Sequence, residues 1–411
     1  MNLSEELAWR GFVNQTTYPS PSALDGEPIT FYLGVDPSAS SMTVGNLAVM
    51  MMVRHFVQHG HKAILLVGGA TGMIGDPDGK KQERDLLTLE QIDANKKALA
   101  RQYRQILGEL PFELVDNYDW FKGIGYLDFL RDVGKHVPMR QMLGRDFVQS
   151  RLGEDGAGIS YAEFSYSLIQ GYDFVHLHKE MGATLQICGA DQWGNSITGV
   201  DLIRRLTGNE AHVWSAPLVI NKSTGVKFGK SEGGAVWLDA NQTSPYDFYQ
   251  FWLNVDDEGV ESYLKIYTLL GKEELGDVMG EFSQDRTGRA AQKHLAYNVT
   301  AIVHGQQVAD NVLRVTELLF GKAELEAADY SVIKSVMPST PIAAGMPLLE
   351  ALVTLGLATS NTEARRFVAE GAITVNNTRA TSEKQTLDHD AFQSGIVVLR
   401  RGKNTIAVGS L

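Results

Sequence analysis

Ile29-Thr-Phe-Tyr-Leu-Gly-Val-Asp36 is an almost unbroken apolar run that ends in a carboxylate. A run of this kind, followed by a polar loop, is typical of a strand that is buried on both faces. Residues 44–58 are apolar and stop before Gly60, which predicts a helix, and residues 62–67 predict a second strand. Apolar strands separated by a helix pair in parallel, so we expect a doubly wound, Rossmann-like α/β domain. Such sheets bind their ligands at the carboxyl ends of the strands.

Apolar patterns of the same kind predict further helices and strands along the rest of the 411 residues. Residues 163–177 predict a helix and residues 184–188 a further strand, while residues 244–319 have helical periodicity. Residues 322–345 contain two prolines and several small residues, as linkers do. A helix, turn, helix pattern with short strands then begins. We therefore predict an α/β domain at 1–232, an α-helical domain at 233–321, a linker at 322–345 and a small α+β domain at 346–411.

The composition is that of an ordinary soluble protein, with 44% hydrophobic and 21% charged residues. The sequence has no run of about 20 apolar residues to span a bilayer and no basic-then-apolar signal, so we expect a cytoplasmic protein without a membrane partner. The single cysteine, Cys188, excludes intramolecular disulfides and Cys-rich metal sites. A net charge of −12 argues against indiscriminate nucleic-acid coating, although residues 361–411 hold seven Lys or Arg against five Asp or Glu.

Lys227-Phe-Gly-Lys-Ser231 places two ammonium groups on a short loop. Gly225 and Gly229 allow the backbone to bend sharply, and each lysine is a mobile charge with three donors. Such a loop can close over a polyphosphate, although a five-residue match on its own is more often a solvated turn. It is not a Walker loop, because Thr224 stands where that motif needs a glycine.

Two polar loops follow the first two strands. Residues 36–46 open a helix, and a helix N-terminus favours phosphate; the alternative is an ordinary capped helix. Gly45 would let a nucleoside lie against that helix. Residues 68–77 hold four glycines, and Asp76 would hold an ammonium group; the alternative is a tight turn. The dinucleotide motif G-x-G-x-x-G is absent from the sequence.

Tyr166, Gln170 and Asp173 are spaced to share one face of a helix. Apolar neighbours suggest that this helix is buried on several sides, and buried polar groups need partners, so the face predicts a small polar ligand. A solvated helix face is the alternative. Asp191 follows a strand, where it would accept hydrogen bonds from ribose hydroxyls, or else form an Asx turn.

Several blocks, in one order along essentially the whole chain, resemble bacterial tyrosyl-tRNA synthetases, which are class I aminoacyl-tRNA synthetases. They are Tyr32-Leu-Gly-Val-Asp-Pro37, Leu66-Val-Gly-Gly-Ala-Thr-Gly-Met-Ile-Gly-Asp-Pro77, Asn117-Tyr-Asp-Trp120, Phe129-Leu-Arg-Asp-Val-Gly-Lys-His136, Glu163-Phe-Ser-Tyr166, Asp191-Gln-Trp-Gly-Asn195 and Lys227 to Ser231. Such a set is far more specific than any single motif.

The resemblance implies a role for each group of residues. Contacts to the tyrosine phenol and ammonium groups fall on Tyr32, Asp173, Asp76, Tyr166 and Gln170. The adenosine and the substrate carboxylate would meet Gly34, Asp36, Gly45, Asn46, Gly189, Asp191 and Gln192. The phosphates would meet the catalytic set Ser38, Thr43, Lys80, Arg84, Lys227 and Lys230. No metal ligand is implied among the side chains; Mg²⁺ would accompany ATP, bound through phosphate oxygens and water.

The family loop His-x-Gly-His reads Thr43-Val-Gly-Asn46 in this chain. A threonine offers only one neutral donor to a phosphate, whereas an asparagine can still hydrogen-bond a ribose oxygen. We nevertheless expect an active enzyme that joins L-tyrosine to tRNA(Tyr) at the expense of ATP. The substrate carboxylate is itself the nucleophile, so no protein base is needed and catalysis consists of positioning and charge stabilisation.

Residues 347–377 resemble a small RNA-binding domain that is shared with a ribosomal small-subunit protein. The basic residues that would contact tRNA phosphates are Arg365, Arg366, Arg400, Arg401 and Lys403, unless they form a solvated face. The resemblance to tyrosyl-tRNA synthetases further implies that residues 1–232 form the catalytic domain with a dimer-forming insertion. It also implies that residues 233–321 form the anticodon-side domain. We expect a homodimer.

Two other functions are weighed against this one. The absent histidine would suit a catalytically impaired RNA-binding paralogue. A tryptophan-specific sister enzyme is less favoured, because an indole N–H gives no reason to pair Tyr32 with Asp173.

Overall fold

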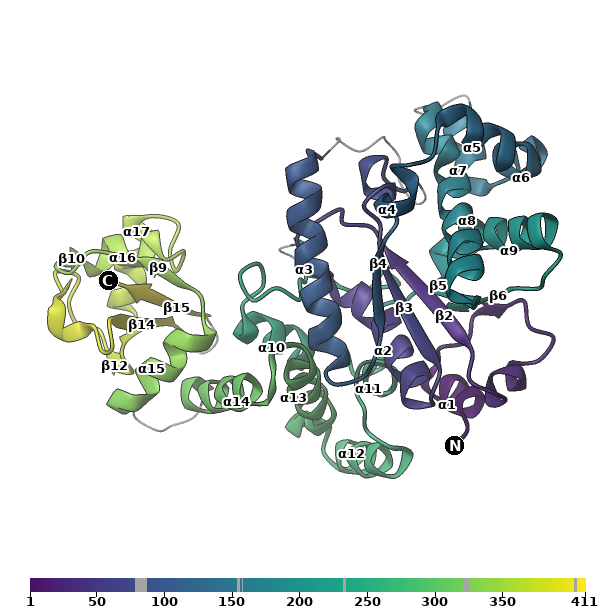
Figure 1. The fold of residues 1–411 in the computed structure, drawn as a ribbon. Coiled ribbons are helices and arrows are strands. Elements are labelled where there is room, and N and C mark those ends of the chain that lie inside the picture. The colour runs from purple at the N-terminus through teal and green to yellow at the C-terminus, as the bar shows by residue number, and fades with distance from the viewer. Residues whose placement is uncertain (78–86, 154–155, 157, 232–233, 321–324, 403–404) are drawn as a thin grey trace. The chain divides into compact units, whose positions relative to one another are not determined.

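The computed structural model describes residues 1–77, 87–153, 156, 158–231, 234–320, 325–402 and 405–411 (Figure 1). The chain forms two compact units. The first unit comprises Met1–Leu238 and Val255–Ala291, and the second comprises Asp239–Asn254 and Gln292–Leu411. Among these described residues, no helix is both long and apolar enough to cross a membrane.

The first unit is built on a six-stranded sheet in the order β1-β6-β5-β2-β3-β4. Its strands are β1 (Gln15–Thr16), β2 (Thr30–Val35), β3 (Lys62–Val67), β4 (Glu113–Asp116), β5 (Ala183–Gly189) and β6 (His212–Ala216). Only the short β1 pairs antiparallel; the other neighbours pair in parallel. The chain builds outward from β2 through β3 to β4 and then returns on the other side with β5 and β6. This order confirms the predicted doubly wound sheet and puts its switch point between β2 and β5.

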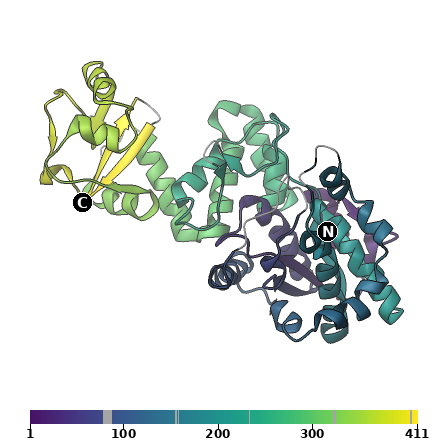
Figure 2. The ribbon, with the colours of Figure 1, turned by 90° about the horizontal axis from the view of Figure 1, so that it is seen from above.

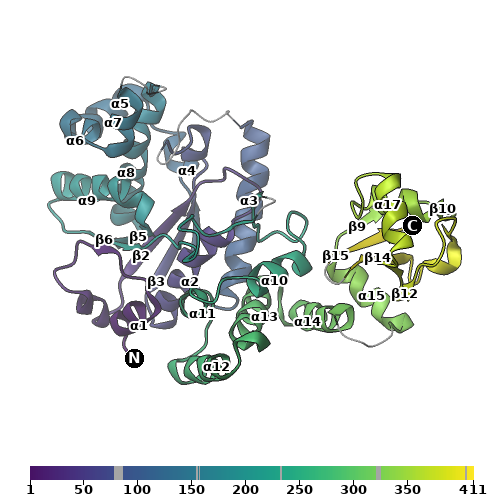
Figure 3. The same cartoon turned by 180° about the vertical axis from the view of Figure 1, so that it is seen from behind.

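Helices cover both faces of this sheet (Figures 1 and 3). Phe31 packs against Phe56 of α2 (Val44–Gln58), whereas the next residue, Tyr32, packs against Phe174 of α8 (Tyr161–Met181). Successive side chains of a strand point to opposite faces, so α2 and α8 lie on opposite sides. The observed bounds of α2 and β3 are those that the sequence predicts.

The remaining elements of the first unit surround these layers. Its helices are α1 (Leu3–Arg10), α3 (Leu89–Leu107), α4 (Tyr118–Phe121), α5 (Tyr126–Asp132), α6 (Met139–Leu143), α7 (Asp146–Leu152), α9 (Trp193–Thr207), α11 (Val260–Tyr267) and α12 (Lys272–Gln284). A short hairpin consists of β7 (Lys230–Ser231) and β8 (Gly234–Ala235). Helices α4 to α7 form an insertion between β4 and α8.

The second unit combines helices with a five-stranded sheet in the order β12-β11-β14-β15-β9. Its helices are α10 (Pro245–Leu253), α13 (Ala290–His304), α14 (Gln306–Phe320), α15 (Ala327–Val336), α16 (Leu348–Thr354) and α17 (Asn361–Ala369). Its strands are β9 (Ser339–Pro341), β10 (Met346–Pro347), β11 (Ile373–Val375), β12 (Thr378–Arg379), β13 (Thr386–Leu387), β14 (Ile396–Arg401) and β15 (Thr405–Ser410). Side chains of α16 and α17 share one apolar core with β11 and β14. Figure 2 shows this part of the ribbon from above, in the light green and yellow of the C-terminal residues.

The segment expected to be a linker, residues 322–345, contains regular structure. Helix α15 and strand β9 lie within it. Tyr330, Ile333 and Val336 recur every three residues and are buried, which explains the helix, and both prolines lie beyond its end. The predicted domain boundaries at residues 232, 321 and 345 stay predictions.

Candidate functional site

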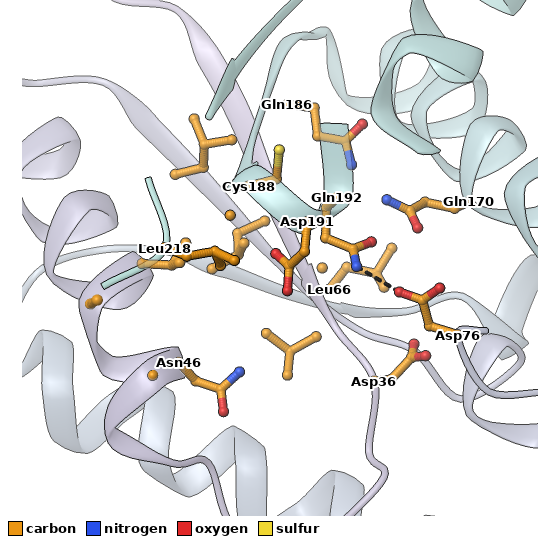
Figure 4. A pocket seen from close by; sticks show the side chains of 18 of the residues that line it. Asp36, Asn46, Leu66, Asp76, Gln170, Gln186, Cys188, Asp191, Gln192 and Leu218 are labelled. Atoms are coloured by element: carbon orange, nitrogen blue, oxygen red, sulfur yellow. Dashed lines mark hydrogen bonds between the residues drawn. The ribbon is translucent and has the colours of Figure 1, made fainter. Parts of the chain in front are cut away.

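A cavity of about 350 Å³ opens at the carboxyl ends of β2 and β5, where the strand order reverses. In Figure 4, Asn46 lies toward one end of it and Asp76 and Gln170 toward the other. The structure brings together the following predicted residues at its walls: Tyr32, Gly34, Asp36, Ser38, Thr43, Gly45, Asn46, Asp76, Tyr166, Gln170, Asp173, Gly189, Asp191, Gln192 and Lys227. Lys80, Arg84 and Lys403 lie outside the described residues, as does the side chain of Lys230.

The floor of the cavity carries a buried carboxylate, Asp173, on α8. Its Oδ2 accepts a hydrogen bond from Asn117 Nδ2 at 3.1 Å, and its Oδ1 accepts one from Trp120 Nε1 at 2.9 Å. Burial raises the pKa of Asp173 well above its usual range, while both donors favour the charged form. Asn117 Oδ1 in turn accepts from the backbone N–H of Ala70 at 2.7 Å, so the loop after β3 fixes this arrangement.

Tyr32, at the same floor, has a hydroxyl that lacks a hydrogen-bond partner among the described residues. The side chain is 1% exposed, and burial, reinforced by the nearby charge of Asp173, raises its pKa well above the usual value. A buried polar group without a partner costs about 1–3 kcal/mol. The floor of the cavity therefore presents an unsatisfied hydroxyl close to a carboxylate, which is an arrangement that a bound hydroxyl group would complete.

Two further carboxylates, Asp36 and Asp76, line the part of the cavity that lies across from Asn46 (Figure 4). Tyr166 donates its hydroxyl to Asp36 Oδ2 at 2.8 Å, and burial raises the pKa of Tyr166 well above the usual value. Gln192 donates Nε2 to Asp76 Oδ2 at 2.5 Å (Figure 4). The tyrosine, the glutamine and the carboxylates thus form a polar, negatively charged zone that suits an ammonium group.

The opposite end of the cavity is formed by the start of α2. The backbone N–H and the hydroxyl of Thr43 both donate to Asn46 Oδ1, each at 3.0 Å. The threonine hydroxyl is therefore engaged with the Asn46 side chain, whose oxygen also caps the Thr43 backbone N–H at the start of the helix. Lys227 lies nearby, with its Nζ 3.5 Å from Asp191 Oδ2, and both side chains are exposed. The helix N-terminus and this lysine give the end of the cavity positive character.

The lysine loop is held by apolar packing and by backbone pairing. The Phe228 ring stacks on Tyr263 of α11, with ring centroids 4.5 Å apart. The N–H of Val44 donates to the Val236 carbonyl at 3.1 Å. Gly229 has a φ of +96°, and a Cβ at this position would lie 2.6 Å from a Val44 methyl group. Only glycine therefore fits between the loop and the start of α2.

The predicted tRNA contacts that the structure describes lie on α17 and at the end of β14: Arg365, Arg366, Arg400 and Arg401. Arg365 is exposed and pairs with Glu383 at 2.8 Å. The guanidinium groups of Arg366 and Arg401 lie 5.1 and 5.0 Å from the ring centre of Phe367. Arg400 instead donates to the Leu319 carbonyl, so it is engaged with its own unit.

Sequence reasoning assigned no role to Asn117, Trp120 or Gln186. The first two hold Asp173, and Gln186 lines the cavity with a buried Oε1 that has no hydrogen-bond partner among the described residues. Gln186 also pairs with Tyr32 across β5 and β2. The available signal was positional: Asn117 directly follows a strand, at the sheet edge where ligands bind.

Comparison with known proteins places the chain in a family. Residues 24–321 match the model for class I tRNA synthetases of tryptophan and tyrosine, and residues 329–408 match that for the SYY-like C-terminal domain of tyrosine–tRNA ligases. The chain is 41% identical over 415 residues to the tyrosine–tRNA ligase of Lactococcus lactis subsp. cremoris, covering 98% of each chain. The chain belongs to the tyrosine–tRNA ligase family. A second tyrosine–tRNA ligase, from Rhodopirellula baltica, is 43% identical over 422 residues, or 99% of this chain and 96% of that one.

Solved structures agree with membership of the tyrosine–tRNA ligase family. A C-terminally truncated mitochondrial tyrosyl-tRNA synthetase from Aspergillus nidulans superposes with a TM-score of 0.70 at 30% identity, covering 78% of this chain and 94% of that one. Plasmodium falciparum tryptophanyl-tRNA synthetase, at 14% identity and a TM-score of 0.54, shares the fold alone. The fold does not separate tyrosine from tryptophan enzymes, whereas identity over the full chain does.

Proposed function

We propose that this chain activates L-tyrosine with ATP, releasing pyrophosphate, and transfers the tyrosyl group to the 3′ end of tRNA(Tyr). The observation that carries the proposal is the cavity floor, where the unsatisfied Tyr32 hydroxyl lies close to the buried Asp173 carboxylate. A substrate phenol donates to Asp173 and accepts from Tyr32, so it satisfies both groups. Phenylalanine in the same position leaves the Tyr32 hydroxyl unpaired and gives the buried Asp173 carboxylate no donor of its own, which is costly in a site from which water is excluded.

The amino-acid end of the substrate would lie in the middle of the cavity. Asp76, Tyr166 and Gln170 surround the place for its ammonium group, and Gln192 approaches its carboxylate. The carboxylate then points toward the start of α2, where the ATP phosphates would lie. In this arrangement the nucleophile, which is already ionised at neutral pH, would lie beside the α-phosphate.

ATP would occupy the end of the cavity formed by β2, β5 and α2. Asp191 would accept from the ribose hydroxyls, and Gly34, Asp36, Gly45, Asn46 and Gly189, which also line the cavity, would contact the rest of the adenylate. The tyrosine carboxylate attacks the α-phosphorus, a P–O bond forms, and the bond to pyrophosphate breaks. Lys227 and Lys230, with Ser38, Thr43, Lys80 and Arg84, would stabilise the charge that develops on the leaving pyrophosphate.

Magnesium would supply further charge neutralisation when it is bound with ATP. Among the described residues, no group of three or more His, Cys, Asp or Glu side chains is arranged to hold a metal ion. We expect the ion to be held through phosphate oxygens and water. Thr43 contributes little to phosphate binding while its hydroxyl donates to Asn46 Oδ1. Stabilisation of the phosphates therefore falls mainly to the positively charged lysines.

In the second step the terminal ribose hydroxyl of tRNA attacks the carbonyl carbon of tyrosyl-adenylate, and AMP leaves. We assign the tRNA phosphates to the exposed Arg365 and Arg366 and to Arg401, with Lys403 as a further candidate. Arg400 and Arg401 are weaker candidates than the two arginines of α17, because their guanidinium groups donate to the Leu319 and Leu357 carbonyls.

The insertion supports a homodimer. Its exposed large apolar side chains are Tyr126, Leu127, Met139, Leu143, Leu152 and, at the start of α8, Tyr161. A gathering of exposed apolar side chains on one segment marks an interaction surface. We assign this surface to a second copy of the chain in the cytoplasm; light scattering that finds a monomer at working concentration would contradict this assignment.

Tyrosine-dependent exchange of pyrophosphate into ATP tests the function directly. We expect exchange with tyrosine, and far less with tryptophan or phenylalanine. An RNA-binding paralogue with impaired catalysis would show no exchange with any of them, and a tryptophan enzyme would reverse the order.

A further inference from the structure

A continuous chain of hydrogen bonds leads from the insertion into the cavity. Arg145 donates Nη1 to Asn195 Oδ1 at 2.7 Å. Asn195 donates Nδ2 to Gln192 Oε1 at 3.3 Å, and Gln192 donates Nε2 to Asp76 Oδ2 at 2.5 Å. Figure 4 shows the last of these bonds, with the glutamine amide turned toward the carboxylate. Four side chains from three segments are therefore joined in one line, because Gln192 and Asn195 both belong to the start of α9.

The direction of this chain is set by its two ends. A guanidinium group can only donate hydrogen bonds, and a carboxylate can only accept them. Asn195 must therefore turn its oxygen toward Arg145 and its NH₂ group toward Gln192. Gln192 must then turn its oxygen toward Asn195 and its NH₂ group toward Asp76. Arg145 and Asp76 together leave each amide with one orientation.

The arginine is itself fixed in place. It precedes α7, and its Nη2 donates to the Gly194 carbonyl at 2.9 Å and to Thr198 Oγ1 at 2.6 Å. Asn195 lies in the first turn of α9 and is 4% exposed. The chain is thus anchored on α9, and its central member, Asn195, is shielded from water, so the orientation of that amide is maintained by protein groups.

We infer that Arg145 and Asn195 are positioning residues for tyrosine recognition, because they fix the orientation of the Gln192 amide and thereby the Asp76 carboxylate. The inference rests on the proposed function, in which Asp76 meets the substrate ammonium group. If the Gln192 amide were reversed, its oxygen would face a carboxylate oxygen. Two acceptors at hydrogen-bond distance repel one another, so Asp76 would turn away or take up a proton, and the ammonium group would lose its partner.

Asn195→Asp tests this inference, since the new carboxylate still accepts from Arg145 but cannot donate to Gln192. Gln192 must then reverse its amide to donate to the new carboxylate. We expect the KM for tyrosine to rise about tenfold in pyrophosphate exchange, which is the effect of losing about one charge-assisted hydrogen bond. The KM for ATP should change less than twofold.

Substrate analogues separate this effect from general damage. Tyramine keeps the ammonium group, so its inhibition constant should rise about as much as the KM for tyrosine. 4-Ethylphenol lacks both the ammonium group and the carboxylate, so its inhibition constant should be nearly unchanged. Equal weakening of both analogues would overturn the inference, and so would an unchanged affinity for tyrosine and tyramine.

Variants of Arg145 and its neighbour supply a second route if Asn195→Asp does not fold. Arg145→Lys keeps a hydrogen-bond donor at this position and should retain most of the tyrosine affinity. Arg145→Gln can turn either its amide oxygen or its NH₂ group toward Asn195, so it no longer fixes the orientation and should lose affinity for tyrosine and tyramine. Thr198→Val removes another partner of Arg145 outside the amide chain and should leave the tyrosine KM unchanged. If the wild-type protein shows no exchange with tyrosine, the proposed function fails; tyramine binding measured by calorimetry still tests the positioning role.

Discussion

The Tyr32 hydroxyl should destabilise the empty protein and stabilise the tyrosine complex. Tyr32→Phe is therefore expected to raise the stability of the empty protein and to weaken its binding of tyrosine. The substitution removes one oxygen, which is buried and has no hydrogen-bond partner among the described residues. It leaves the ring, whose centroid lies 5.1 Å from that of Phe174, to pack as before.

The two magnitudes follow from the hydroxyl's surroundings. Removing an unsatisfied buried polar group should raise the free energy of unfolding of the empty protein by about 1–3 kcal/mol, less a few tenths for the small void. A neutral hydrogen bond to the substrate contributes about 0.5–1.5 kcal/mol, so its loss should raise the dissociation constant of tyrosine about 2- to 12-fold. Phenylalanine never makes this bond, so discrimination should fall by a similar factor.

Tyr103→Phe is the matched control. Tyr103 is equally buried, but its hydroxyl donates to the Leu66 carbonyl at 3.3 Å. Its removal should lower the free energy of unfolding by about 1 kcal/mol and leave tyrosine binding unchanged. Urea unfolding without ligands gives the stabilities, and pyrophosphate exchange with tyrosine and phenylalanine gives the discrimination. The reasoning fails if Tyr32→Phe destabilises the empty protein as the control does, or if discrimination stays the same.

Further predictions concern charge, domain role and pH. Lys230→Ala should slow adenylate formation at least about a hundredfold with little change in tyrosine affinity, and an unchanged single-turnover rate would refute its role. Asp173→Ala should abolish tyrosine binding but spare ATP binding; calorimetry showing unaltered tyrosine affinity would contradict this. Deleting residues 341–411 should spare exchange and impair charging of tRNA(Tyr), and normal charging would refute the assignment of the tail. Burial, reinforced by Arg10, lowers the pKa of His55 to about 3, so this histidine stays neutral in the folded protein at pH 5 but is protonated once unfolded. Lowering the pH from 7 to 5 should therefore reduce the free energy of unfolding by about 2 kcal/mol through this histidine alone. In urea unfolding, His55→Leu should make the free energy of unfolding depend less on pH over this range. The same pH dependence in the variant would count against this prediction.

The sequence predicts the sheet and its main helices because their signal is local. Helix α2 and strand β3 have the predicted bounds, since apolar runs and a following glycine define them without reference to the rest of the chain. Helix α15 was missed because nearby prolines outweighed a short apolar repeat. Cavity residues such as Asp173 were found from helical spacing. Their supporting contacts were not, because Asn117 reaches Asp173 across 56 positions of sequence, and no local pattern reports such a contact.

Thr43 shows a different limit. A threonine in place of a histidine suggests only a weaker phosphate donor, and the residue type says nothing of its partner. In the structure its hydroxyl bonds to Asn46, the other position at which the chain departs from the family loop. The two departures are thus parts of one capping arrangement, which is visible only when the helix is built.

The first unit is discontinuous, because the chain passes between the two units three times, after residues 238, 254 and 291. A fragment that ends at residue 238 would hold every residue that lines the cavity, yet it would lack α11 and the Tyr263 ring on which Phe228 stacks. During synthesis the sheet is complete once β6 has emerged, whereas the lysine loop acquires its support only after α10, a helix of the other unit, has also been made. The ATP end of the cavity should therefore be the last part of the site to become ordered on the ribosome, and the smallest fragment able to form adenylate should extend to about residue 291.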